Sequence, residues 1–178
     1  MLLYAPPLLE QEENEMTDEL RQQYLREIFE YRDGNLYWKI NKRSKMKNKK
    51  AGYITSTGYV HVRIDGKTYV AHRLIWVYHN GSFGDMEIDH INRTKNDNRI
   101  ENLRLATKAQ NRQNVGIRKD NSTGYKGVSY RKDTKKWRVQ VGVSGKQITF
   151  GYFDDIELAA LVATMAREKY HGDFFNHG

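Results

Sequence analysis

Cysteine is absent from the 178 residues of this chain, and its absence excludes several kinds of site at once. Without thiols the chain has no disulfide, no cysteine nucleophile and no zinc or iron–sulfur site built on cysteine. Any metal ion must therefore be held by oxygen atoms or by imidazole nitrogens. The lack of cysteine also agrees with an intracellular protein, and we expect a cytoplasmic location.

Long apolar runs are missing as well. No stretch of about 18 apolar residues occurs, so we expect no membrane-spanning helix and no membrane partner. The N-terminus lacks a basic flank followed by an apolar stretch, so we also expect no signal peptide. Hydrophobic residues make up 38% of the chain and charged residues 29%, which supplies apolar material for modest cores only. A chain of this length forms one large domain or two small ones.

The net charge of +8 is unevenly distributed. Residues 1–30 hold eight acidic and two basic side chains, a net charge of −6, so the rest of the chain carries +14. A body this basic suits a polyanionic partner, and a basic surface with no nucleic-acid partner is the alternative. Residues 1–16 show no apolar periodicity, and we interpret them as an acidic, disordered tail.

A helix is expected directly after this tail. Thr17 suits its N-cap, and the apolar residues of 20–29 repeat at helical spacing. We expect Asp33-Gly34 to end the helix in a turn, with a short strand over 36–38.

The next segments are a charged loop, a hairpin and a helix. Asp65-Gly66 predicts a hairpin turn within 52–70, and 72–79 fit a short buried helix. The loop over 39–50 is dense in positive charge, and it either contacts phosphate or faces solvent. Its candidate DNA-binding residues are Lys47, Lys49 and Lys50.

Residues 84–116 contain the most informative pattern. A strand is expected to end at residue 90, an Asn- and Asp-rich loop follows, and a second strand covers 102–105. Thr107 with Gln110 three residues later forms a capping box, so a helix begins there. We expect this strand–loop–strand–helix order to bring four side chains together, Asp89, His90, Asn102 and Asn111.

Those residue types suit phosphodiester hydrolysis. The carboxylate of Asp89 and the amide oxygen of Asn111 are hard ligands for Mg²⁺ or Mn²⁺. The imidazole of His90 can take a proton from water, and the amide of Asn102 can accept its other N–H and fix the tautomer. The alternative for each residue alone is the capping of a turn, but four in this order favour a site.

This segment resembles the ββα-metal, or HNH, nuclease motif in the form found in phage and intron-encoded homing endonucleases. The preceding residues 71–76 also look like the entry to that group. The resemblance covers roughly residues 20–116 and implies that Asp89 and Asn111 bind the metal. It also implies that His90 is the general base and that Asn102 orients it. Many HNH proteins have His at the last position, and a degenerate, inactive copy is the alternative. We expect His72 to be a structural hydrogen bonder beneath the site.

A second module is expected over 124–178, after a linker over 117–123. Strand patterns at 125–131, 137–143 and 146–151 precede a helix over 154–170, which predicts a three-stranded antiparallel sheet with one packed helix.

This module resembles the Apetala-two or ethylene-response-factor DNA-binding domain, with matches at Gly124–Val128, Trp137–Val139, Gly151–Asp154 and Glu157–Ala160. The resemblance implies that one face of the sheet enters the DNA major groove. The residues that it places on this face are Lys126, Ser129, Arg131, Arg138, Gln140, Gln147 and Thr149. An interaction module of another kind is the alternative.

We therefore expect an α+β protein with an HNH module over 17–116 and a DNA-binding module over 124–178. It would be a metal-dependent, homing-type endonuclease that acts on double-stranded DNA as a monomer and leaves a nick. If phage-encoded, it would work in the cytoplasm of a bacterial host. A DNA-binding regulator with an inactive HNH module and an RNA-binding protein are the alternatives.

Overall fold

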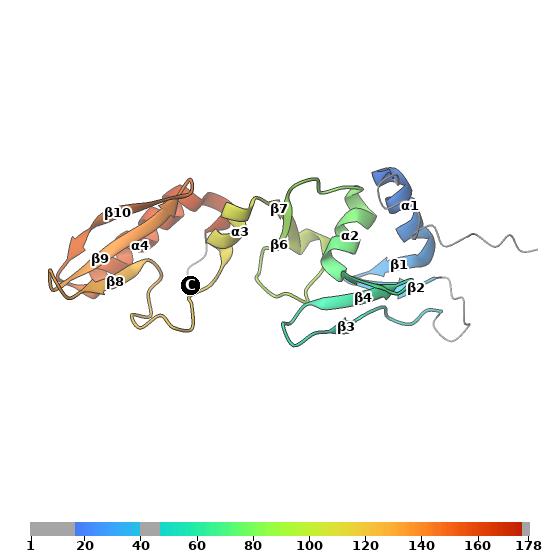
Figure 1. The fold of residues 1–178 in the computed structure, drawn as a ribbon, viewed down its shortest axis with the longest axis horizontal. Helices are drawn as coiled ribbons and strands as arrows, with labels where there is room; N and C mark the ends of the chain where they lie inside the picture. Colours follow the sequence, from blue (N-terminus) through green and yellow to red (C-terminus); the bar gives the residue numbers. More distant parts are fainter. Residues whose placement is uncertain (1–16, 40–46, 176–178) are drawn as a thin grey trace, which may run out of the picture. The chain divides into compact units, whose positions relative to one another are not determined.

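The computed structural model describes residues 17–39 and 47–175 and divides the chain into two compact units, Met1–Leu105 and Ala106–Gly178 (Figure 1). We call them the first and the second unit. The predicted tail over 1–16 and most of the charged loop lie outside the described residues. The predicted HNH module crosses the division between the units, because the helix that carries Asn111 belongs to the second unit.

The first unit combines two helices with small antiparallel sheets, as the predicted α+β class requires. It begins with α1 (Asp18–Ile28), the hairpin β1 (Phe29–Arg32) and β2 (Asn35–Trp38). A three-stranded sheet and a helix follow, β3 (Tyr53–Ile54), β4 (Val60–Ile64), β5 (Lys67–Val70) and α2 (Ala71–Asn80). The unit ends with β6 (Glu87–His90), the 3₁₀ turn η1 (Ile100–Asn102) and β7 (Leu103–Ala106), whose last residue opens the second unit.

Helix α1 is shorter than predicted. Its N-cap is confirmed, since the Thr17 hydroxyl accepts the Leu20 N–H at 3.3 Å. The prediction that it runs to the Asp33-Gly34 turn is wrong, because Phe29 already begins β1 opposite Trp38. The turn residues have φ of +42° and +77°, which suits a two-residue hairpin between strands.

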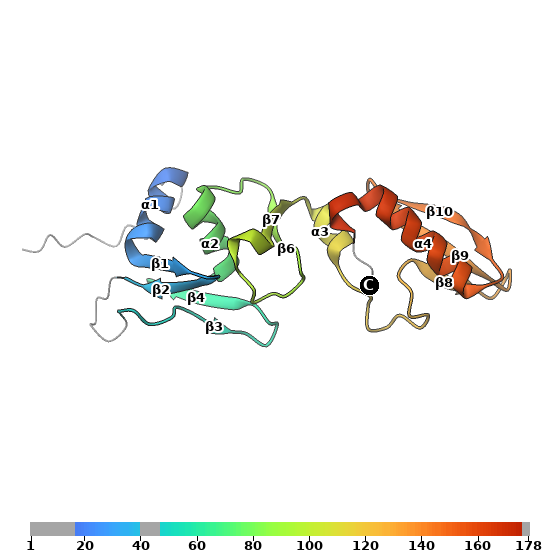
Figure 2. The ribbon, with the colours of Figure 1, turned by 180° about the vertical axis from the view of Figure 1, so that it is seen from behind.

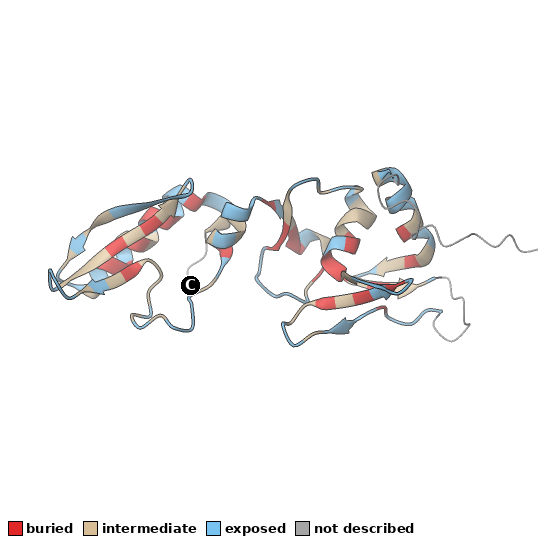
Figure 3. Cartoon of the chain, viewed as in Figure 1, coloured by how far each residue is buried: buried red, intermediate tan, exposed pale blue. Residues whose placement is uncertain are grey.

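The core of the first unit lies between the two helices and the β4 sheet. Along β4 buried residues alternate with more exposed ones (Figure 3), and the Asp65-Gly66 hairpin to β5 is confirmed. Phe29, Val62 and Ile75 are completely buried, and each stabilises the unit by about 1.5–3 kcal/mol. This core supports α2 and the β6–β7 sheet from one side.

The second unit is a three-stranded antiparallel sheet with one helix packed on it, as predicted. Its elements are α3 (Lys108–Asn114), β8 (Val128–Arg131), β9 (Lys136–Val143), β10 (Lys146–Phe153), α4 (Ile156–His171) and η2 (Gly172–Phe174). Helix α4 lies behind the sheet in Figure 1 and in front of it in Figure 2. Ala159 and Ala163 are buried and let α4 approach Val139 of the central strand closely. Within the described ranges, no helix has the length and apolar character needed to cross a membrane.

Candidate active site

The candidate site centres on strand β6, which pairs with β7 in a two-stranded sheet. The last two residues of β6, Asp89 and His90, are 7% and 5% exposed. Burial of an acid and an imidazole side by side is costly unless each has a partner, so their contacts indicate what the site is built to do.

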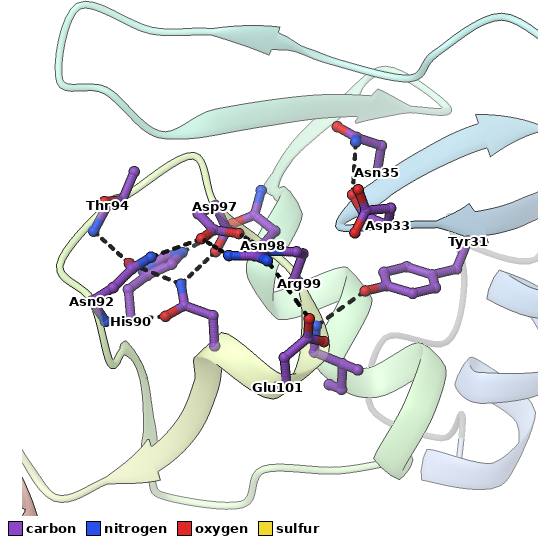
Figure 4. Close-up of polar contacts among 12 residues, drawn as sticks. Tyr31, Asp33, Asn35, His90, Asn92, Thr94, Asp97, Asn98, Arg99 and Glu101 are labelled. Carbon is purple, nitrogen blue, oxygen red and sulfur yellow. Dashed lines mark hydrogen bonds and ion pairs between the residues drawn. The ribbon is translucent and has the colours of Figure 1, made fainter.

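The loop after β6 is held in shape by its own polar side chains (Figure 4). Asn92 accepts the Thr94 N–H at 2.8 Å and donates to Asp97 at 2.7 Å. Asn102 donates to Asn92 Oδ1 at 2.9 Å and to the Asp97 carbonyl at 2.7 Å, and its own oxygen accepts the Asn92 N–H. Arg99 donates two hydrogen bonds to Asp97, which hold the pKa of this carboxyl well below its usual range.

The hairpin β1–β2 anchors the far end of this loop. The Tyr31 hydroxyl accepts the Ile100 N–H at 3.0 Å. Gly34, at the tip of the hairpin, lies so close that an added Cβ would be 2.7 Å from the backbone nitrogen of Arg99. The shape of the loop therefore depends on the β1–β2 hairpin. In the sequence this hairpin precedes the site by more than half the length of the first unit.

Asn98 is the residue that holds His90. Asn98 is only 2% exposed, and its Oδ1 lies 2.9 Å from His90 Nε2 (Figure 4). An amide oxygen only accepts, so Nε2 donates and a neutral ring has its lone pair on Nδ1. This tautomer makes Nδ1 the atom that can take up a proton.

Two aromatic side chains pack beside His90. The ring centroids of His72 and His90 lie 4.9 Å apart, at an interplanar angle of 82°. The ring centroid of Tyr59 lies 5.6 Å from that of His72 and 6.2 Å from that of His90. Burial, and then the neighbouring His90, lowers the pKa of His72 to about 3, so His72 is neutral near pH 7. The prediction of a structural hydrogen bonder does not hold for its Nδ1, which is buried and has no hydrogen-bond partner among the described residues.

Arg104 of β7 binds the carboxylate of Asp89. Its Nε and Nη2 donate to Asp89 Oδ2 at 3.0 Å and 2.8 Å, with the two side chains 16% and 8% exposed. A guanidinium in this geometry fixes the orientation of a carboxylate and partly neutralises it. Asp89 is thereby presented in one orientation before any ion or substrate arrives.

Comparison with known proteins shows to which family the chain belongs. Residues 69–113 match the HNH endonuclease family. Over 104 residues the chain is 36% identical to protein 3.8 of Escherichia phage T7, an alignment that covers 58% of this chain and 85% of that protein. The chain belongs to the HNH endonuclease family. The HNH resemblance predicted from the sequence is thereby confirmed.

This HNH chain is also similar to a chain of a solved structure. The subject of that structure is DNA binding and cleavage by the HNH homing endonuclease I-HmuI. The two share 25% sequence identity with a TM-score of 0.38, over 48% of this chain and 52% of that chain. This HNH chain thus spans about half the length of that solved chain.

The predicted HNH residues are placed as follows. Asp89 and His90 lie together at the end of β6, and Asn102 ends η1 at the base of the loop. The hydrogen bond to His90 that was expected from Asn102 comes instead from Asn98, and Asn102 supports the loop on which Asn98 lies. Asn111 lies on α3, whose predicted capping box is confirmed, and its role as a ligand stays a prediction.

Sequence reasoning missed Asn98 because three asparagines lie in the same loop, Asn92, Asn96 and Asn98. All three suit turns equally well, and only burial separates the one that points inward. The one available signal was its spacing, eight residues after His90.

The donor set of the HNH site fits a hard divalent cation. No group of three or more His, Asp or Glu side chains that could hold a metal occurs in 17–39 and 47–175. An ion would therefore have few protein ligands, and the predicted pair of one carboxylate and one amide oxygen, from Asp89 and Asn111, is the kind of set that Mg²⁺ accepts.

The predicted DNA-binding side chains of the second unit pair across the sheet. Arg138 lies opposite Ser129 and donates to its hydroxyl at 3.5 Å, and Gln140 lies opposite Thr149 and donates to it at 3.4 Å. These four therefore share one face of the sheet.

The remaining predicted contacts are placed less uniformly. Arg131 forms an ion pair with Asp133, and Gln147 is exposed on β10. The ammonium of Lys126 donates to the carbonyls of Gln113 and Val115, at the end of α3. In the first unit the three predicted DNA-binding lysines of the charged loop are all exposed, Lys47, Lys49 and Lys50.

Proposed function

We propose that this HNH protein is a metal-dependent DNA endonuclease of the homing type, which hydrolyses one phosphodiester bond of duplex DNA. The observation that carries this proposal is the contact between His90 Nε2 and Asn98 Oδ1. It leaves the other ring nitrogen as a base, on the residue that follows the buried Asp89 in strand β6.

In the proposed reaction His90 Nδ1 accepts a proton from the attacking water. Asn98 holds the ring in the required tautomer, and Asn102 acts as a positioning residue through the loop. Asp89 and Asn111 would hold Mg²⁺ or Mn²⁺. When bound, that ion neutralises charge on the phosphate and on the leaving oxygen.

The proposed DNA contacts come from both units. In the second unit the polar sheet face would lie in the major groove, as its resemblance to the Apetala-two domain implies. In the first unit the exposed lysines of the charged loop would contact phosphates. One general base per chain makes a nick the expected product of a monomer, in the cytoplasm of a bacterial host if the protein is phage-encoded.

The test is cleavage of supercoiled plasmid and of bacterial genomic DNA by the full chain, with Mg²⁺, Mn²⁺ or EDTA. We expect metal-dependent conversion to open circles and a loss of about 1,000-fold or more in His90→Ala, with DNA affinity retained. Loss of DNA binding in that variant would show that His90 is structural. Arg63→Ala, at an exposed position on β4, is the control.

The ion pair between Asp89 and Arg104 favours one alternative, a DNA-binding regulator with an inactive HNH module. A carboxylate already neutralised by a guanidinium is a weaker ligand for a cation. Tight, salt-sensitive binding of duplex DNA without cleavage under any metal condition would establish this alternative.

A further inference from the structure

The second unit contains a cavity of about 340 Å³ that none of the HNH residues of the first unit lines. It is bounded by α3, by the β9–β10 hairpin and by the C-terminal end of α4. Its lining residues all belong to the second unit.

The charge of the cavity has one sign. Among the described residues that line it, five have basic side chains and none has an acidic one; the basic ones are Arg112, Lys126, Lys146, Arg167 and His171. Basic side chains on an open surface are solvated and mutually screened, but around a partly enclosed cavity they raise the potential at one point.

Two of these basic residues are built into the core of the unit. Arg167 is 4% exposed, and it donates to the Ala163 carbonyl at 3.3 Å and to the Thr164 hydroxyl at 3.4 Å. A buried guanidinium is expensive to desolvate, so its position beside a cavity calls for a reason. These contacts hold the guanidinium in place beside the cavity.

His171 also lines the cavity. The residue is 9% exposed, and its Nε2 donates to the Gly142 carbonyl at 2.9 Å. Its Nδ1 is buried without a hydrogen-bond partner among the residues described.

Neutral donors complete the lining. The amides of Gln113, Gln140 and Gln147 line the same cavity as the basic side chains. Guanidinium, ammonium and amide N–H groups around a small volume match the several acceptor oxygens of a phosphate.

We propose that this cavity binds a phosphate group. The chemistry fits either a backbone phosphate of DNA or a free phosphate compound. The inference goes beyond the proposed function because it requires no cleavage. Lys126, Gln140 and Gln147 belong both to the cavity and to the predicted DNA-binding residues, so a backbone source of the phosphate rests on the proposed binding of DNA.

The test uses the full chain in EDTA, titrated with inorganic phosphate at constant ionic strength and followed by ¹H–¹⁵N NMR. The double variant Arg112→Gln/Lys146→Gln removes two exposed charges from the cavity, so the fold is preserved. Lys132→Gln/Lys135→Gln removes two exposed charges of the same unit that do not line it.

We expect saturable shifts at the Gly142 and His171 amides, an affinity at least tenfold weaker in the cavity variant, and a change of less than twofold in the control. Absence of saturable shifts, or equal losses in both variants, would overturn the proposal.

A short duplex DNA identifies the source of the phosphate. Displacement of inorganic phosphate by the duplex assigns the cavity to a DNA backbone phosphate, and retention of phosphate on the DNA complex assigns it to a free phosphate compound. Because EDTA prevents cleavage, these results are independent of the plasmid assay, which can fail while phosphate binding holds.

Discussion

The two units bury polar side chains in different ways. Within the described part of the first unit the buried polar residues gather at the HNH site, and their partners include other side chains, as in His90 with Asn98 and Asp89 with Arg104. In the second unit Arg167 donates to the main-chain carbonyl of Ala163, and His171 donates to the main-chain carbonyl of Gly142.

We attribute the difference to the two proposed roles, catalysis in the first unit and recognition of an anion in the second. A general base needs a fixed tautomer, which a side-chain partner of defined polarity selects. A cation that recognises an anion needs only to be held in place, which a carbonyl does without removing its charge. The contrast predicts that changes at the buried HNH residues alter chemistry and that changes at the cavity of the second unit alter affinity.

The largest expected effect comes from core substitutions that destabilise one unit and leave the other folded. Phe29→Ala empties the centre of the first unit and should lower its free energy of unfolding by about 3–5 kcal/mol. Hydrogen exchange measured by mass spectrometry should show faster exchange over 17–105 and continued protection of β9. Ala163→Leu overpacks the helix–sheet contact and should cost the second unit about 1–3 kcal/mol, with the opposite exchange pattern. Faster exchange in both units from either variant would contradict their independence.

The buried His72 should make the first unit sensitive to acid. Its pKa is about 3 in the folded unit and 6.5 when unfolded, so below pH 6.5 the unfolded chain binds a proton that the folded unit excludes. The stability that neutral His72 contributes is fully present above pH 6.5. Below pH 6.5 the free energy of unfolding should fall by about 1.4 kcal/mol for each unit of decrease in pH, a loss of about 3 kcal/mol at pH 4.5. Urea unfolding in a Trp137→Phe background would follow the first unit through Trp38 and Trp76, and His72→Phe should flatten the dependence. An equally steep dependence in His72→Phe would assign it to other groups.

Replacing Asn98 should reduce catalysis and leave DNA affinity unchanged. Asn98→Ala removes the partner of His90 and should lower the nicking rate by about 10- to 100-fold. Asn98→Asp keeps an acceptor, should restore part of the rate, and should move the acidic limb of the pH–rate profile to higher pH because a carboxylate favours the protonated imidazole. An unchanged profile in Asn98→Asp would remove Asn98 from the mechanism.

The smallest expected effect concerns Arg104. Arg104→Gln removes the cation from Asp89, and affinity for Mn²⁺ should rise by about three- to tenfold in the DNA-free chain. Electron paramagnetic resonance of free Mn²⁺ measures this affinity without any turnover. Arg63→Gln, an exposed charge on β4, should leave it unchanged. A lower affinity in Arg104→Gln would mean that orientation of the carboxylate outweighs charge.

Local signals in the sequence predicted most elements correctly. The Thr107 capping box, the Asp65-Gly66 turn and the three strands of the second unit all depend on neighbours in the chain, which the sequence displays. The end of α1 was mispredicted because Phe29 fits both the helical period and an alternating strand. Pairing with Trp38 decides between them, and pairing is not a local property.

The same limit applies to the sites. Asp89 and His90 could be predicted because they are adjacent on one strand. The contacts of Asn98 and Arg104 depend on which side chains a folded loop and a neighbouring strand bring inward. The cavity of the second unit joins residues from four separated segments, and no spacing in the sequence indicates it.

The anchoring of the site loop by the β1–β2 hairpin has a consequence for the order of folding. Gly34 and Arg99 are 65 positions apart, and their contact closes a long stretch of chain at an entropic cost. Hairpins and helices that need only local contacts form faster. We therefore expect the loop that carries Asn98 to fold late, on a β1–β2 hairpin that has already formed. Because the hairpin precedes the loop in the chain, the hairpin also leaves the ribosome first.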